Sequence, residues 1–240
     1  PLRILVLGRS NSGKSSLINA LFGELKTATD VLTGTAQSLE PFVLSREGFT
    51  QALIFDSPGC DSSFFDSKPM LIAAGNADLI LWITPANRPD RQIERQFLDA
   101  LRTYQAARME RRPAPLLVVV SFIDRLRPAN EWQPPYDLTD TANIKSANIA
   151  AAVQAVAADL AVPAGQVIPV SLREGKSYNV DDTLWAAILN HQDEALRIRL
   201  MRCLDAKKRA EDWVMLRRQM AGAGRFLRDL PERLGKRVDK

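Results

Sequence analysis

The spacing of apolar and polar positions along the chain predicts an α/β protein. The first apolar run, residues 2–7, ends at Gly8, and an apolar periodicity typical of a helix follows over residues 14–22. Gly23 then supplies the residue type that commonly ends a helix. The chain therefore begins with an expected strand, a glycine-bearing loop and a helix.

The same two kinds of pattern recur downstream. Further strands are expected at residues 40–45, 52–56, 78–84, 116–122 and 166–171, with a hairpin turn at Glu47 and Gly48. Helical patterns fall at about residues 91–108, 143–160 and 181–190. Strands that alternate with helices at this spacing indicate a mostly parallel sheet with helices on both faces. Residues 126–141 form a long connection, which is the kind that is usually functional or mobile.

Composition agrees with this prediction and excludes several classes. The 240 residues are 46% hydrophobic and 25% charged, which is typical of a soluble globular protein with one large α/β domain or two small ones. The apolar runs at 79–83 and 116–120 are far shorter than the roughly 20 residues that span a bilayer. The start at Pro1, without a charged and then apolar leader, indicates a processed or excised segment.

Cysteine and histidine content restricts the chemistry further. Cys60 and Cys203 lie far apart, and His191 is the single histidine. A disulfide framework, a Cys-rich metal site and a Ser-His-Asp triad are therefore not supported, and a reducing compartment is expected.

One segment carries a specific phosphate-binding motif. Residues 8–15 (GRSNSGKS) fit G-x-x-x-x-G-K-[ST] and lie between an expected strand and helix, as the motif requires. In such a loop the backbone N–H groups turn toward an anion, Lys14 adds charge at the β- and γ-phosphates, and the Ser15 hydroxyl can bind Mg²⁺. A glycine turn before a capped helix would not require Lys-Ser at this spacing. The expected phosphate-binding residues are Asn11, Ser12, Gly13, Lys14, Ser15 and Ser16.

A second motif follows about 40 residues later, at the end of the 52–56 strand. Residues 56–59 read D-x-x-G, which places the Asp56 carboxylate behind an expected Mg²⁺ ion. Gly59 allows its N–H to approach a γ-phosphate closely. The tetrapeptide alone would also fit a plain turn, but its distance from the phosphate-binding loop favours the functional interpretation.

Together the two motifs resemble the Era-like GTPases of the translation-factor-related P-loop class. The opening GRSNSGKSSLINALFG is close to that family's GRxNxGKSSLxNAL, and the resemblance covers about residues 2–190. It implies a Ras-like three-layer α/β fold with a mostly parallel six-stranded sheet, one antiparallel strand and helices on both faces. It also implies a magnesium–GTP site, two switch segments and slow GTP hydrolysis. The alternatives on the same loop are a nucleotide-binding adaptor without turnover and an ATPase with relaxed base specificity.

The base-recognition motif departs from the family pattern. Where the family has [NT]-K-x-D, residues 121–124 read S-F-I-D. The retained Asp124 has two carboxylate oxygens that can accept from guanine N1–H and N2–H₂ together, although it would also suit a plain loop cap. Ser121 is a shorter substitute for Asn or Thr, and the Phe122 ring can stack on the base in place of the lysine stem. We expect a preference for guanine that these changes can relax.

Two further segments complete the site that the resemblance implies. Ser171 and Leu172 correspond to the family's S-A-[KL], whose backbone N–H groups touch guanine O6, although a simple strand end would look the same. In the first switch Thr35, with Thr33 as the alternative, corresponds to the threonine that binds Mg²⁺. The expected metal ligands are Ser15, Thr35 and Asp56.

Two positions bear on hydrolysis. Cys60 stands where Ras-like GTPases carry the glutamine that orients water, so stimulation by a protein activator or effector is expected. Asn11 matches the asparagine that holds K⁺ in potassium-stimulated family members, or it only stabilises the loop. The expected catalytic residues are Lys14, Thr35, Gly59 and Asn11. Effector contacts in the second switch, or core residues, are Phe64, Phe65 and Met70.

The positive charge is concentrated near the end of the chain. Residues 191–240 contain 14 Lys+Arg and 8 Asp+Glu, a net charge of +6, whereas residues 1–190 contain 18 and 20, a net charge of −2. Apolar positions between 226 and 238 recur at helical spacing among these basic residues. The pattern predicts a basic helical extension that binds an anionic membrane surface or RNA, or that is solvated or packed on the GTP-binding domain. A cytoplasmic location, or the cytoplasmic face of a membrane, follows as the expectation.

Overall fold

The fold was determined as a computed structural model that describes residues 2–22, 41–46, 49–61, 66–107, 113–173 and 176–191. The strands are β1 (Leu2–Gly8), β2 (Pro41–Arg46), β3 (Phe49–Asp56), β4 (Leu79–Pro85), β5 (Leu116–Ser121), β6 (Val167–Pro169), β7 (Ser171–Arg173) and β8 (Lys176–Tyr178). The helices are α1 (Lys14–Phe22), α2 (Ser67–Asn76), α3 (Gln92–Ala106), α4 (Ile144–Leu160) and α5 (Trp185–Asn190).

Six strands form one sheet in the order β2-β3-β1-β4-β5-β6. All neighbours are parallel except β2 and β3, which are antiparallel. Every residue of β4 is buried, because this strand is covered on both faces. The expected mostly parallel sheet with one antiparallel strand is confirmed.

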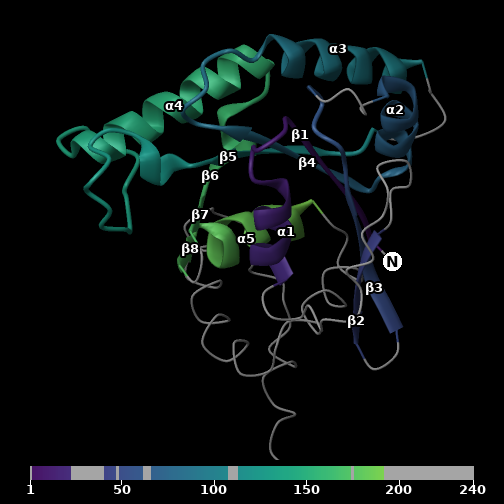
Figure 1. Ribbon diagram of the computed structural model, residues 1–240, viewed down its shortest axis with the longest axis horizontal. Helices are drawn as coiled ribbons and strands as arrows, with labels where there is room; N and C mark the ends of the chain where they lie inside the picture. Colours follow the sequence, from purple (N-terminus) through teal and green to yellow (C-terminus); the bar gives the residue numbers. More distant parts are fainter. Residues whose placement is uncertain are drawn as a thin grey trace, which may run out of the picture. The chain divides into compact units, whose positions relative to one another are not determined.

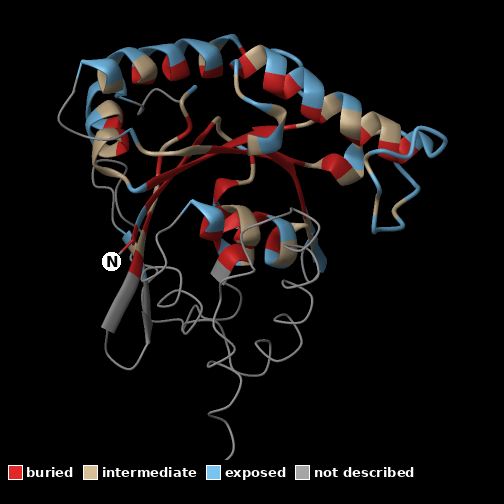
Figure 2. Cartoon of the chain, turned by 180° about the vertical axis from the view of Figure 1, so that it is seen from behind, coloured by how far each residue is buried: buried red, intermediate tan, exposed pale blue. Residues whose placement is uncertain are grey.

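Helices cover both faces of this sheet, as Figures 1 and 2 show. α2, α3 and α4 lie on one face, where Trp82 of β4 stacks on Phe97 of α3 with ring centroids 5.5 Å apart. α1 and α5 lie on the other face, where the buried indole N–H of Trp185 donates to the Leu21 carbonyl at 3.2 Å. The result is the three-layer Ras-like arrangement.

Three local elements differ from the sequence-based expectation. α2 was not expected, because its apolar residues form one continuous run at 70–74 without helical spacing; of these only Met70 and Ala74 are buried. The expected strand 166–171 ends at Pro169, and Ser171 begins a separate hairpin in which it pairs with Tyr178. The expected helix 181–190 begins as a π-helical turn, Val180–Leu184, before α5.

Met70, an expected effector contact or core residue, is 7% exposed and belongs to the core. Several other expected features lie outside the described residues: Thr33, Thr35, the Glu47-Gly48 turn, Phe64, Phe65 and the extension beyond His191. Within the part of the chain that is described, no helix is both long enough and apolar enough to span a membrane.

Candidate nucleotide-binding site

The phosphate-binding loop joins β1 to α1 through two glycines with positive φ. Gly8 has a φ of 153° and Gly13 a φ of 100°, which side-chain-bearing residues rarely adopt. A Cβ at Gly8 would also lie 2.2 Å from the Ile83 carbonyl oxygen of β4. The Leu17 N–H donates to the Gly13 carbonyl at 2.8 Å and so makes the first backbone hydrogen bond of α1. The N–H groups of the first turn, at residues 14–16, precede that bond, and this is the part of a helix that binds anions.

Lys14 lies over its own loop. Its side chain is 8% exposed, and Nζ donates to the Arg9 carbonyl at 2.8 Å and the Gly8 carbonyl at 3.5 Å. Burial lowers the pKa of Lys14, and the carboxylate of Asp56 opposes this effect. A bound phosphate would give this ammonium group a charged partner in place of neutral carbonyls.

Ser15 and Asp56, two of the three expected metal ligands, are in contact. Ser15 Oγ donates to Asp56 Oδ2 at 3.2 Å, and Asp56 Oδ1 accepts from the Ser57 N–H at 2.9 Å. The first turn of α1, where Ser16 is also exposed, therefore meets the end of β3. Hydroxyl and carboxylate oxygens are the ligands that Mg²⁺ prefers.

Gly59 packs directly on the phosphate-binding loop. A Cβ at this position would lie 2.2 Å from Ser10 Oγ and 2.3 Å from Ser10 N, which explains the glycine of D-x-x-G. The next residue, Cys60, donates its N–H to the Gly8 carbonyl at 3.0 Å. Burial raises the pKa of the Cys60 thiol to about 12, so this group is neutral at physiological pH.

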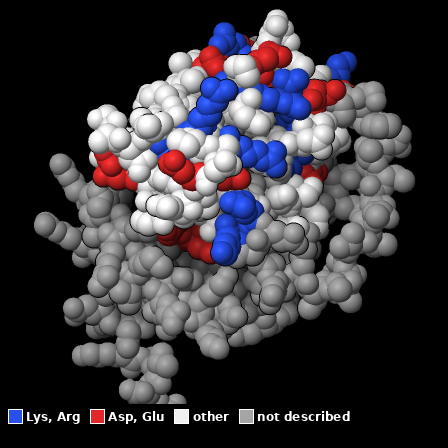
Figure 3. All heavy atoms as spheres, turned by 60° about the vertical axis from the view of Figure 1, so that its left-hand side comes forward, with Lys and Arg blue, Asp and Glu red and all other residues white. Residues whose placement is uncertain are grey.

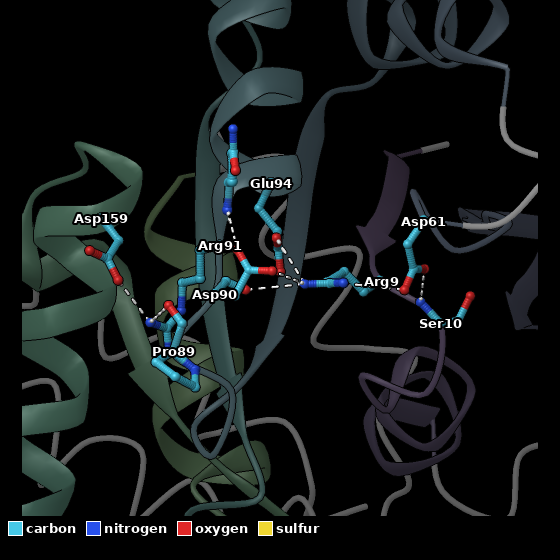
Figure 4. Close-up of polar contacts among 9 residues, drawn as sticks. Arg9, Ser10, Asp61, Pro89, Asp90, Arg91, Glu94 and Asp159 are labelled. Carbon is cyan, nitrogen blue, oxygen red and sulfur yellow. Dashed lines mark hydrogen bonds and ion pairs between the residues drawn. The ribbon is translucent and has the colours of Figure 1, made fainter.

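A network around Arg9 ties this segment to α3, as Figure 4 shows. Asp61 Oδ1 accepts from the Ser10 N–H at 2.7 Å, and Asp61 Oδ2 accepts from Arg9 Nε at 3.3 Å. Arg9 also donates to the Asp90 carbonyl at 3.1 Å and lies 3.9 Å from the buried Glu94 carboxylate. Burial alone would raise the pKa of Asp61, but the hydrogen bonds from Ser10 and Arg9 lower it to about 2. Sequence reasoning missed this network, because G-x-x-x-x-G-K-[ST] assigns no role to Arg9 or Ser10 and because Asp61 lies 52 positions after Arg9.

The two expected guanine-recognition segments also meet. Asp124 lies in a 3₁₀ turn, Ile123–Arg125, and its Oδ1 accepts from Ser171 Oγ at 3.2 Å. Phe122 precedes this turn with a φ of 58°, and the Arg125 guanidinium lies 4.2 Å from the centroid of its ring.

These segments adjoin the phosphate-binding loop at Gly13. A Cβ at Gly13 would lie 3.4 Å from Leu172 Cδ1 and 3.8 Å from Phe122 Cζ. Ser121 is fully buried, and its hydroxyl donates to the Ser12 carbonyl at 2.7 Å. Ser121 therefore stabilises the phosphate-binding loop through this hydrogen bond to its backbone. Asn11 lies exposed on the loop with a φ of 58°.

Comparison with known proteins agrees with this geometry. Residues 3–121 match the 50S ribosome-binding GTPase family. The chain is 32% identical over 128 residues to the probable tRNA modification GTPase MnmE of Cyanidioschyzon merolae, which covers 51% of this chain and 26% of that protein. It is 28% identical over 111 residues to GTPase Era of Rickettsia akari, which covers 42% and 36% respectively. The matched region belongs to the Era-like class of P-loop GTPases.

The chain thus covers about a quarter to a third of the length of these two relatives. Among solved structures, Era in complex with MgGDPNP and nucleotides 1506–1542 of 16S ribosomal RNA superposes with a TM-score of 0.47 and 18% identity. That match covers 80% of this chain and 57% of the other. Similarity at this level adds nothing about function.

Proposed function

We propose that the chain binds GTP and GDP together with Mg²⁺, hydrolyses GTP slowly and acts as a nucleotide-controlled switch. Residues 1–190 would form the GTP-binding domain, and residues 191–240 a basic helical extension. GTP would order the first switch and the segment after Gly59, and hydrolysis would release them.

The observation that carries the proposal is the contact between Ser15 and Asp56 beside the buried Lys14. In the proposed complex Ser15 and Thr35 bind Mg²⁺, with Asp56 behind the ion. Backbone N–H groups from Asn11 to Ser16 and the Lys14 ammonium bind the phosphates.

The base would lie at the other end of the same loop. Asp124 would accept from guanine N1–H and N2–H₂, while Phe122 and Leu172 flank Gly13. Backbone N–H groups at Ser171 and Leu172 would contact guanine O6. Ser121 would act indirectly, by holding the Ser12 carbonyl.

Hydrolysis would be slow without a partner. The neutral Cys60 thiol is a poor substitute for a glutamine that orients water, so unassisted turnover is expected to stay below about 10⁻² s⁻¹. K⁺ held by Asn11 would supply positive charge beside the phosphates, and the exposed position of Asn11 on the loop supports this proposal.

Nucleotide content and phosphate release test the proposal. Purified protein is denatured, and the released nucleotide is identified by chromatography; GTP turnover is then followed with Mg²⁺ and with excess EDTA. We expect bound guanine nucleotide and Mg²⁺-dependent phosphate release. Bound adenine nucleotide would favour an ATPase, and bound GDP without turnover would favour an adaptor.

The basic extension remains the proposed contact for a membrane surface or RNA. On the face of the GTP-binding domain in Figure 3, basic and acidic side chains are interspersed, and residues 1–190 carry a net charge of −2. Deletion of residues 222–240 is expected to abolish co-sedimentation with anionic vesicles at low salt and to leave GTP affinity unchanged. If the chain without the deletion stays in the supernatant, the membrane proposal is contradicted. Loss of RNA binding on the same deletion would favour the alternative.

A further inference from the structure

Lys145 occupies a position unusual for a lysine. It lies in the first turn of α4, yet it is only 2% exposed. Its Nζ donates to three backbone carbonyls, those of Asp124 at 2.8 Å, Leu126 at 2.5 Å and Pro128 at 3.1 Å. An ammonium group has three N–H donors, so each can be matched to one of these acceptors.

This arrangement fixes Asp124 from two sides. Lys145 holds its backbone carbonyl to α4, and Ser171 Oγ contacts its carboxylate at 3.2 Å. Two parallel hydrogen bonds to a base require a carboxylate in one orientation, because both oxygens must meet their donors at once.

The segment that follows the Asp124 turn, and that contains Trp132 and Tyr136, packs over Lys145. The Trp132 ring centroid lies 5.7 Å from Lys145 Nζ, and Trp132 packs against Tyr136 and Tyr178 at centroid distances of 5.3 and 5.6 Å. The Tyr136 N–H donates to the Tyr178 hydroxyl at 2.9 Å. Tyr178 pairs with Ser171 in the β7–β8 hairpin, so the segment connects the backbone near Asp124 to the strand that carries Ser171.

We infer that Lys145 is a positioning residue for base specificity, which aligns the Asp124 carboxylate so that it reads both guanine N1–H and the guanine 2-amino group. The inference rests on the proposed binding of guanine nucleotides. Lys145 would not touch the nucleotide. Its loss would let the turn that carries Asp124 shift, and the second hydrogen bond to the base would be lost first.

The affinity ratio of GDP to IDP tests this inference, because inosine lacks only the 2-amino group. A hydrogen bond to a charged group is worth about 1.5–3 kcal/mol, so wild-type protein is expected to bind GDP roughly 10–100-fold more tightly than IDP by calorimetry. Lys145→Met is expected to reduce this ratio to below about 3. Tyr178→Phe is the matched control, since it removes a hydrogen bond from the same segment without changing the acceptors of Lys145; its ratio should stay at the wild-type value.

The outcomes separate a positioning role from general stabilisation. Circular dichroism checks folding, and Lys145→Gln replaces Lys145→Met if that variant does not fold; because its amide has only two N–H donors for the three carbonyls, it should also lower the ratio. An unchanged GDP to IDP ratio in the Lys145 variant would overturn the inference alone, as would an equal loss of the ratio in Tyr178→Phe. Wild-type protein that binds neither nucleotide would refute the proposed function, and the inference with it.

Discussion

The hydrogen bonds of Asp61 make a prediction about stability that needs no nucleotide. Asp61 joins the segment after Gly59 to the phosphate-binding loop through the Ser10 N–H and Arg9 Nε. Asp61→Asn keeps the shape of the side chain but removes the negative charge that both donors meet. We expect this variant to be less stable than wild type at neutral pH.

The expected loss of stability in Asp61→Asn follows from the pKa of Asp61, which falls from its ordinary value of 3.8 to about 2. A tenfold change in proton affinity corresponds to about 1.4 kcal/mol, which sets an upper limit of roughly 2.5 kcal/mol. Solvent reaches this position, and its screening reduces the expected loss to about 1 kcal/mol. A lowered folded-state pKa gives stabilisation that is complete above the ordinary pKa and is lost as pH falls toward 2.

The assay is urea unfolding followed by tryptophan fluorescence at several pH values between 7 and 3. The difference between wild type and Asp61→Asn should be largest at pH 7 and should shrink below pH 4. Asp90→Asn is the matched control: the Asp90 carboxylate lies 3.7 Å from the same arginine but its side chain is 71% exposed, so only a few tenths of a kcal/mol are expected. Equal losses in the two variants, or an Asp61→Asn difference that is constant down to pH 3, would refute this reasoning.

Three further predictions concern the nucleotide site. Lys14→Ala should abolish GTP and GDP binding in calorimetry while circular dichroism is unchanged; retained wild-type affinity would contradict the phosphate-binding assignment. Asp124→Asn should weaken GTP binding about 10–100-fold and improve binding of xanthosine triphosphate, because one charged hydrogen bond is lost; equal competition by ATP and GTP in wild type would argue against guanine recognition. Replacing Na⁺ by K⁺ at constant ionic strength should accelerate phosphate release, and Asn11→Ala should remove the difference; identical rates in both salts would exclude K⁺.

The sequence determined the sheet and the phosphate-binding loop, because both depend on local properties of the chain. Fully apolar strand runs require cover on both faces, and the β4 run is buried throughout. The loop needs Gly8 and Gly13 for its positive φ values, and Lys14 and Ser15 follow at a fixed spacing. Because these residues are contiguous and sterically restricted, the conformation of the loop depends little on the rest of the fold.

Only the tertiary structure decided which charged side chains support this site. Arg9 and Asp61 are 52 positions apart, and the acceptors of Lys145 lie 17 to 21 positions before it. In the sequence Lys145 looks like an ordinary surface lysine, since lysine is almost never fully buried unless it is paired. α2 was missed for a related reason: its apolar residues form one continuous run, and which of them are buried, Met70 and Ala74, depends on the sheet that the helix covers. The partner of a charged side chain depends on which distant segments the fold brings next to it, and the local periodicity of the sequence does not contain that information.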